Sequence, residues 1–159
     1  MTSALLNRTT ATKENALTDK ERNAFLAEKR IGRLASQRAD GWPHVTPIWY
    51  VWEDGRFLLS LGKSRRHLRN IAEDPHVTMC VDDDPRMTDL TKAPRSVVCF
   101  GVATLVEDEH AVRDATRKVE DRYLEGASGP ELEEMLWFEG RTLVEIEPVQ
   151  WLAWDQGKG

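Results

Sequence analysis

Residues 31–61 read IGRLASQRADGWPHVTPIWYVWEDGRFLLSL, and this stretch sets the expected fold class. Apolar and polar residues alternate along it with a period of two, which is typical of half-buried β-strands. The alternation occupies three segments, at 31–38, 44–52 and 56–61. Asp40-Gly41 and Asp54-Gly55 separate these segments, and Asp-Gly is a common two-residue hairpin turn. The pattern therefore predicts three consecutive antiparallel strands, a β-meander.

Strand and helix patterns continue on both sides of this stretch. Thr18-Asp19-Lys20-Glu21 forms a capping box that opens a helix, and helical spacing returns at 107–124 and 131–137. Further strands are expected at 76–81, 96–106, 141–147 and 149–154, the last two separated by Pro148. Gly101 inside a strand indicates a bulge or a close backbone approach. Together these patterns predict an α+β fold, which is a small closed or split β-barrel of six or seven mostly antiparallel strands with two to four peripheral helices.

The composition is that of an acidic protein, with a formal net charge of −5 and a pI near 5.4. Binding to nucleic acid requires a broad basic surface, so we expect no such partner. No apolar run is long enough to span a membrane and the N-terminus lacks a secretory signal, so we expect a cytoplasmic protein without a membrane partner. The two cysteines, Cys80 and Cys99, lie in apolar runs, so we expect both thiols to be reduced and buried. Residues 1–16 lack apolar periodicity, which indicates a flexible N-terminal arm before a single domain over 17–159.

The segment Gly62–Ala72, GKSRRHLRNIA, places three arginines and a histidine at the start of a short helix. Ser64 is the expected N-cap, which would leave backbone N–H groups and the positive end of the helix dipole facing an incoming anion. Arg65, Arg66 and Arg69 would add charge-assisted hydrogen bonds. This segment comes directly after a predicted strand, and that position favours a phosphate-binding site. The alternative is a basic helix face that is exposed to solvent.

Several motifs along the chain resemble one known family. They are Gly32-Arg33-Leu34-Ala35, the run Asp40-Gly41-Trp42-Pro43-His44-Val45-Thr46-Pro47-Ile48-Trp49, the basic helix and Asp74-Pro75-His76-Val77-Thr78. In this order they resemble the pyridoxamine 5′-phosphate oxidase-like split-barrel flavoproteins over about 25–106, and the later part agrees only in its general β pattern. The resemblance implies a homodimer that binds FMN, or alternatively the deazaflavin F420, in a groove between subunits.

The same resemblance implies which residues contact the cofactor. The isoalloxazine ring would lie along the second and third strands, and the phosphate would lie at the basic helix. Two alignments of the family's phosphate-binding motif with this sequence stay open. Without a gap, the motif's basic pair aligns with Arg66 and His67 or with Arg65 and His67. With one inserted residue, the motif aligns with Ser64-Arg65-Arg66. The family's lysine is absent in every register, and histidine offers a weaker, pH-dependent contact. The implied cofactor-binding residues are Pro47, Ile48, Trp49, Ser60, Leu61, Ser64, Arg65, Arg66, His67 and Asn70.

The chain contains six tryptophans in 159 residues, which is a high proportion. Trp42, Trp49 and Trp52 lie near the expected groove, where an aromatic ring can stack on a flavin. Trp49 and Trp52 have opposite parity on their predicted strand, so they point to different faces and at most one should reach the ring. The others are expected in the core or in a dimer interface.

No side-chain constellation in the sequence points to chemistry performed by the protein alone. We find no nucleophile–base pair, no paired carboxylates in an apolar setting and no metal cluster, so we assign no catalytic residue and no metal. A bound flavin can carry hydride chemistry while the protein holds and orients it. The resemblance therefore implies an FMN- or F420-dependent oxidoreductase that acts on a small organic substrate. The alternative is a non-catalytic module that binds a flavin or haem, with His44, His67 or His76 as candidate axial ligands.

Overall fold

The computed structural model describes residues 12–83, 93–125, 130, 134, 137 and 140–158. The greater part of the predicted N-terminal arm and of the predicted helix at 131–137 therefore lies outside the described residues. The end of the arm is joined to the last strand of the sheet. Leu17 N–H donates to the Ala153 carbonyl at 3.0 Å, and Asp155 N–H donates to the Asn15 carbonyl at 2.9 Å.

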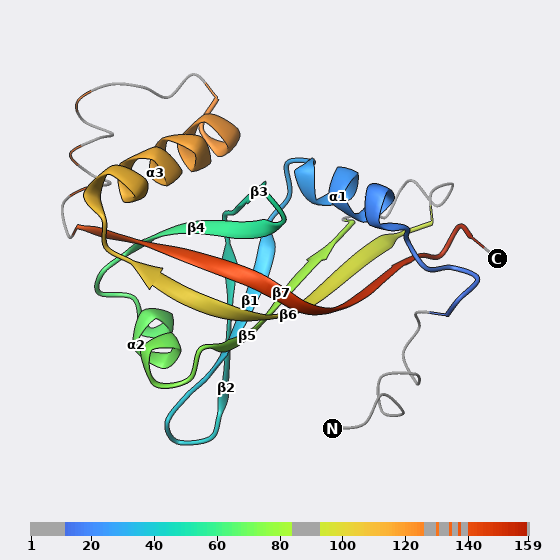
Figure 1. The fold of residues 1–159 in the computed structure, drawn as a ribbon, viewed down its shortest axis with the longest axis horizontal. Coiled ribbons are helices and arrows are strands. Elements are labelled where there is room, and N and C mark those ends of the chain that lie inside the picture. The colour runs from blue at the N-terminus through green and yellow to red at the C-terminus, as the bar shows by residue number, and fades with distance from the viewer. Residues whose placement is uncertain are drawn as a thin grey trace.

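In the described part of the chain, seven antiparallel strands form one curled sheet that is flanked by three helices (Figure 1). The elements are α1 (Asp19–Ala27), β1 (Gly32–Gln37), β2 (Pro43–Ile48), β3 (Val51–Glu53), β4 (Arg56–Gly62), α2 (Arg66–Glu73), β5 (His76–Asp82), β6 (Arg95–Val106), α3 (Glu109–Tyr123) and β7 (Arg141–Asp155). The strand order is β2-β1-β5-β6-β7-β4-β3. The predicted α+β split barrel is confirmed.

The predicted meander is wrong, because the segment 44–52 is two strands at opposite edges of the sheet. The chain leaves β2 after Ile48 and enters β3 at Val51. Between them Tyr50 is fully buried, and its hydroxyl donates to the Leu26 carbonyl at 3.1 Å. Three residue steps span at most roughly 11 Å, so the two edges have to lie close together. This short connection between the two edge strands curls the sheet into a half-barrel.

The long pair β6 and β7 supplies the bend of the sheet. Their register shifts between Phe100 and Gly101, which confirms the predicted irregularity at this glycine. A Cβ atom on Gly101 would lie 2.6 Å from Ile146 Cγ2 and 2.8 Å from the Glu147 carbonyl oxygen, so only glycine fits. The prediction of two separate strands around Pro148 is wrong. The chain accommodates the proline in this irregular register and continues as one strand of 15 residues.

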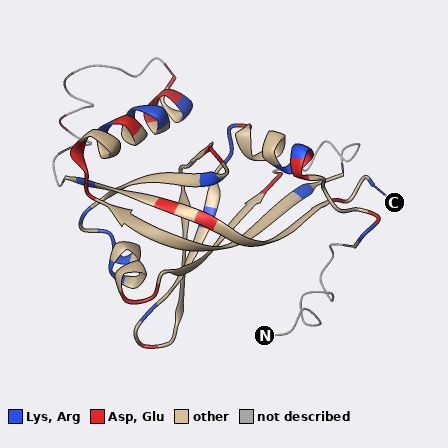
Figure 2. Cartoon of the chain, viewed as in Figure 1, with Lys and Arg blue, Asp and Glu red and all other residues tan. Residues whose placement is uncertain are grey.

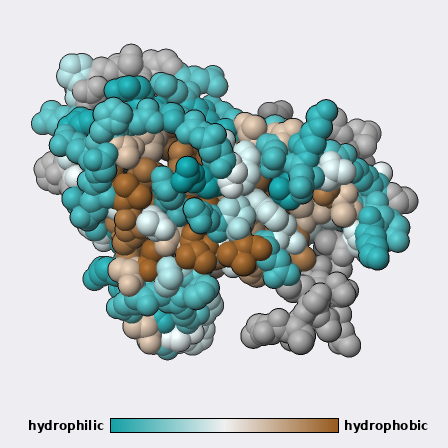
Figure 3. Space-filling model, viewed as in Figure 1, coloured by the Kyte–Doolittle hydropathy of each residue, from teal (hydrophilic) through white to brown (hydrophobic). Residues whose placement is uncertain are grey.

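The core lies inside the curl of the sheet, and α1 and α3 close it. The capping box predicted at Thr18 is present, and α1 buries Phe25 and Leu26 in the main core. The α3 helix packs on β4 and β7, where Val112 and Ala115 meet Leu58 and Leu143. Charges of both signs line the outer side of α3 (Figure 2), and apolar surface lies between α3 and α2 (Figure 3).

Candidate functional site

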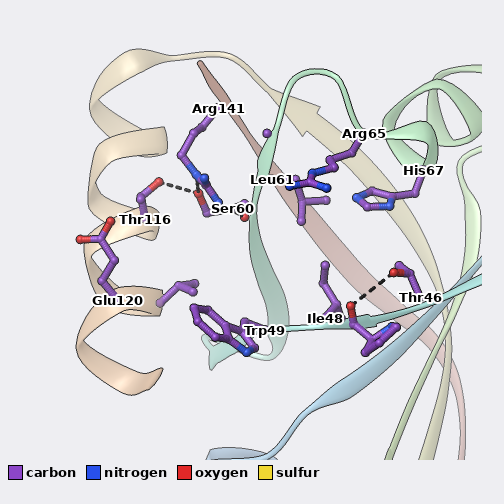
Figure 4. A pocket seen from close by; sticks show the side chains of 13 residues that line it. Thr46, Ile48, Trp49, Ser60, Leu61, Arg65, His67, Thr116, Glu120 and Arg141 are labelled. Carbon is purple, nitrogen blue, oxygen red and sulfur yellow. Dashed lines mark hydrogen bonds between the residues drawn. The ribbon is translucent and has the colours of Figure 1, made fainter. Parts of the chain in front are cut away.

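A pocket of ≈ 290 Å³ lies between the end of β2, the strand β4 and the helices α2 and α3 (Figure 4). It contains most of the cofactor-binding residues implied by the sequence resemblance. These are Pro47, Ile48, Trp49, Ser60, Leu61, Arg65 and His67. They come from segments that are up to 20 positions apart in the sequence, so the fold rather than the chain order brings them together.

One wall of the pocket is the end of β2, an edge strand that pairs only with β1. An edge strand presents unpaired backbone N–H and C=O groups. Pro43 and Pro47 lie four positions apart on this strand and so share one parity, and prolines in a sheet sit where no ladder hydrogen bond is lost. Backbone groups of the 47–49 segment on the free side of β2 can therefore meet a ligand.

Trp49 continues this wall beyond the end of the strand. Its ring stacks on Tyr123 with centroids 5.0 Å apart and an angle of 5° between the ring planes. Trp52 instead packs edge-on against Phe57 and Trp151 beside the core. Trp49 therefore lines the pocket and Trp52 does not, so only one of the two reaches it, as expected. The reason is different from the expected one, because Trp49 lies after the end of β2 and Trp52 lies on β3, and the two do not share one strand.

The facing wall is β4, where Ser60 and Leu61 are both buried. The Ser60 hydroxyl lies 2.6 Å from Thr116 Oγ1 on α3. Arg141 at the start of β7 donates through Nε to Ser60 Oγ at 2.7 Å and through Nη2 to the Ser60 carbonyl at 2.7 Å. Strand β4, helix α3 and strand β7 thus meet at one serine.

The basic segment enters the pocket through Arg65 and His67. Arg65, not Ser64, is the N-cap of α2, and its side chain makes no capping hydrogen bond. The prediction for Ser64 is wrong because a turn closed by Arg65 N–H to the Gly62 carbonyl, at 3.1 Å, delays the helix by one residue. Figure 2 shows the basic residues gathered at this loop and helix.

His67 is 6% exposed, which changes its expected chemistry. Burial, with smaller contributions from His44 and Arg65, lowers the pKa of this imidazole to about 4. Burial therefore favours the neutral ring at physiological pH, whereas the sequence suggested a pH-dependent contact near neutrality. Among the described residues nothing hydrogen-bonds the buried Nε2 atom, although the side chain lines the pocket. A buried polar atom without a partner indicates a position for a ligand or for water.

Three of the implied residues do not line this pocket. Arg66 and Asn70 line a second pocket of ≈ 230 Å³ on the other side of α2, together with Arg38, Asp40 and Arg69. Asn70 is buried and donates through Nδ2 to Ser36 Oγ at 3.0 Å, a contact that joins α2 to β1. Ser64 is exposed in the loop before the helix.

The structure adds pocket residues that the sequence interpretation missed, mainly Thr116, Val119, Glu120 and Arg141. On α3 the buried face includes Val112, Ala115 and Val119, and Thr116 is its polar member. A hydroxyl on the apolar face of an amphipathic helix was a usable signal, because buried polar groups need a partner. Nothing in the sequence near Arg141 indicated its partner on β4.

Two negative findings apply to the described residues. In that part of the chain no three His, Cys, Asp or Glu side chains are placed to hold a metal ion. None of its helices combines the length and the apolar character that crossing a bilayer requires.

The comparisons with known proteins agree with this fold. The family model described as Pyridoxamine 5'-phosphate oxidase matches residues 18–155. A conserved hypothetical protein from Mycobacterium tuberculosis is 28% identical, with a TM-score of 0.77 over 92% of this chain and 90% of that chain. No protein of curated function matches the sequence.

Two more distant structures share the fold alone. An F420 reductase is 24% identical, with a TM-score of 0.64 over 81% of this chain and 94% of that chain. The heme storage protein HutZ from Vibrio cholerae is 21% identical, with a TM-score of 0.67 over 89% and 96%. Because the family model covers the strands, the basic helix and the final strand that build the pocket, the chain belongs to the pyridoxamine 5'-phosphate oxidase family of split-barrel proteins.

Proposed function

We propose that this protein is a flavin-type oxidoreductase that binds FMN, or alternatively F420, in the pocket between β2, β4, α2 and α3. The observation that carries the proposal is the convergence of Pro47–Trp49, Ser60–Leu61, Arg65 and His67 on one pocket. These segments are the ones that the family resemblance assigns to the cofactor. The bound cofactor would supply hydride transfer to or from a small organic substrate.

Arg65 and the first turn of α2 suit the phosphate of such a cofactor. The first backbone N–H groups of a helix lack partners within the helix, and the helix dipole makes that end positive. Arg65 is the N-cap residue and lines the pocket, so its guanidinium would add a charge-assisted hydrogen bond to the same anion.

The walls of the pocket suit a flat ring with a polar rim. Ile48 and Leu61 offer apolar surface, and the free edge of β2 offers fixed backbone donors and acceptors. The neutral His67 ring lines the same space, and its buried Nε2 has no hydrogen-bond partner among the described residues. A polar atom of the ligand would satisfy that nitrogen and remove the cost of leaving it without a partner.

We also propose that a second copy of the chain completes the groove. Trp42, Val45 and Val149 are 71%, 61% and 72% exposed, which is unusual for large apolar side chains of a monomer. The measurement is the molar mass in solution by light scattering, and a monomer at micromolar concentration would contradict the dimer.

One observation favours a second candidate, a haem-binding module without catalysis. Nε2 of His67, which has no hydrogen-bond partner in the described part of the chain, is the kind of neutral imidazole nitrogen that ligates haem iron. Reconstitution with haem should then give a Soret band that disappears in His67→Ala. A band that persists in the variant would contradict His67 as the ligand.

Equilibrium binding of FMN and F420 to the purified apoprotein tests the main proposal, with quenching of tryptophan fluorescence as the signal. Trp49 lines the pocket, so its emission should fall when the ring enters. Binding of either cofactor, followed by turnover of the reduced form with an electron acceptor, would support an oxidoreductase. Binding without turnover would favour the module, and binding of neither would contradict both flavin-based readings.

A further inference from the structure

The guanidinium of Arg141 is held in one position by the Ser60 junction described above. Two of its five N–H donors go to Ser60, one to the hydroxyl and one to the carbonyl, each at 2.7 Å. Ser60 itself is 6% exposed and lies in a regular strand. The Arg141 side chain is therefore fixed by hydrogen bonds to β4, although Arg141 is itself only the first residue of β7.

The directions of the hydrogen bonds at this junction follow from counting donors. Thr116 donates its only hydroxyl proton to the Val112 carbonyl at 2.7 Å. Its oxygen must then accept from the Ser60 hydroxyl at 2.6 Å, and the Ser60 oxygen accepts from Arg141. The series Arg141 to Ser60 to Thr116 to Val112 uses both hydroxyl protons. Ser60 and Thr116 thus have no proton left to donate to a ligand, and the group they orient is Arg141.

The backbone around residue 141 reinforces this placement. Gly140 adopts φ +71°, a left-handed conformation that turns the chain into β7. Its carbonyl accepts from Lys63 N–H at 3.2 Å, and its own N–H donates to the Trp137 carbonyl at 3.0 Å. The turn joins the end of β4 to the beginning of β7, so Arg141 is anchored through both its backbone and its side chain.

Arg141 and Arg65 approach the pocket from different elements. Figure 4 shows Arg141 beside Ser60 and Thr116, and Arg65 beside His67, with Leu61 between the two groups. Glu120 lines the pocket as well, so among the described lining residues the two arginines exceed the formal acidic charge by one. Because His67 is neutral, the excess positive charge of the pocket depends on the two arginines.

We propose that Arg141 is a second anion-binding residue of this pocket and that Ser60 and Thr116 are its positioning residues. An unrestrained arginine loses rotamer entropy when it binds an anion, and the junction removes that cost before the ligand arrives. The ligand chemistry is a phosphate or carboxylate group. It comes either from the cofactor or from an acidic substrate, and this choice of source rests on the proposed function of the pocket.

Inorganic phosphate is the probe that tests the residue without any cofactor. Phosphate is titrated at constant ionic strength, and its dissociation constant is obtained from the shift in unfolding temperature. Because Arg65 lines the same pocket and is itself proposed to bind phosphate, the comparison is made in two backgrounds, wild type and Arg65→Ala. In both, Arg141→Gln should weaken phosphate binding by roughly tenfold. An unchanged dissociation constant in both backgrounds would overturn the proposal.

Arg69→Gln is the matched control for the loss of one positive charge. Arg69 lies on α2 but lines the second pocket, on the other side of that helix, so this variant should leave phosphate binding within about twofold. An equal loss in Arg69→Gln and Arg141→Gln would mean that only the overall charge matters, and it would contradict a specific role for Arg141.

The positioning role of Thr116 has its own test. Thr116→Val removes the acceptor of the Ser60 hydroxyl and should weaken phosphate binding by about threefold or more, whereas Thr116→Ser should restore it. A purely structural role would lower the unfolding temperature of Thr116→Val without changing the phosphate dissociation constant. That result would overturn the positioning role.

Paired ligands identify the source of the anion. If Arg141 contacts the cofactor phosphate, Arg141→Gln should weaken FMN and leave riboflavin unchanged. If it contacts an acidic substrate, FMN and riboflavin should bind the variant equally, and KM for the acidic substrate should rise while kcat changes little. Failure of the wild type to bind any flavin would contradict the proposed function, and the phosphate titration would still decide the role of Arg141.

Discussion

The two sides of α2 differ more than the sequence of the helix indicates. The inner side carries His67, Leu68, Asn70 and Ile71, all at most 7% exposed. The outer side carries Arg66 and Arg69, which are exposed and line a different pocket. Residues adjacent in the sequence thus serve different surfaces, because successive helical residues are about 100° apart. A run of basic residues is therefore not one binding site.

The largest effect is expected where the inner side of α2 enters the main core. Ile71 is 3% exposed in that core, so Ile71→Ala should lower the free energy of unfolding by about 3 kcal/mol. Urea denaturation followed by tryptophan fluorescence measures this. Arg69→Ala on the outer side should change it by less than about 0.5 kcal/mol. Equal losses in the two variants would remove the distinction between the sides.

The next effect concerns cofactor affinity and separates two neighbouring arginines. Arg65 lines the main pocket and Arg66 lines the second one. Arg65→Ala should weaken FMN or F420 binding by roughly 30-fold, because it removes a charge-assisted hydrogen bond, and Arg66→Ala by less than about threefold. Fluorescence titration of the two single variants measures this. A larger loss in Arg66→Ala would place the phosphate on the outer side.

A third effect follows from the buried imidazole on the inner side. In the unfolded chain His67 has a pKa near 6.5, and burial lowers the pKa in the folded protein to about 4. Below pH 6.5 the unfolded state binds a proton that the folded state does not, so stability is complete above pH 6.5 and falls toward pH 4. The loss attributable to His67 should be on the order of 2 kcal/mol.

His67→Gln provides the control for this pH dependence, because glutamine does not titrate. Urea denaturation at intervals from pH 7.5 to pH 4.5 should give a flatter profile for the variant than for the wild type. Identical slopes for the two proteins would show that His67 titrates normally and is not buried in solution.

The smallest effect is expected at the contact between α2 and β1. Ser36→Ala leaves the buried Asn70 amide without its acceptor and should cost about 1 kcal/mol of stability. Cofactor affinity should stay within about twofold, because Asn70 does not line the main pocket. A loss of affinity as large as that of Arg65→Ala would assign Asn70 to the binding site after all.

Features that depend on neighbouring residues were predicted well. The Thr18 capping box, the strands 31–38 and 56–61 and the irregularity at Gly101 are all present. The predicted cap at Ser64 and the unbroken strand over 44–52 are wrong. In each case a contact with a distant or turn residue, the Gly62–Arg65 turn or the Tyr50 hydroxyl bond to Leu26, overrides the local pattern.

The sequence by itself determined the fold class, the family and most of the segments that line the pocket. These depend on alternation, turn residues and motif order, which act over a few positions of the chain. Only the tertiary structure decided that Arg65 and His67 enter the pocket while Arg66 does not, and that Ser60 holds Arg141. Ser60 is 56 positions from Thr116 and 81 from Arg141, and no local pattern encodes contacts across such separations. They form because the curled sheet brings β4, β7 and α3 together around one buried hydroxyl.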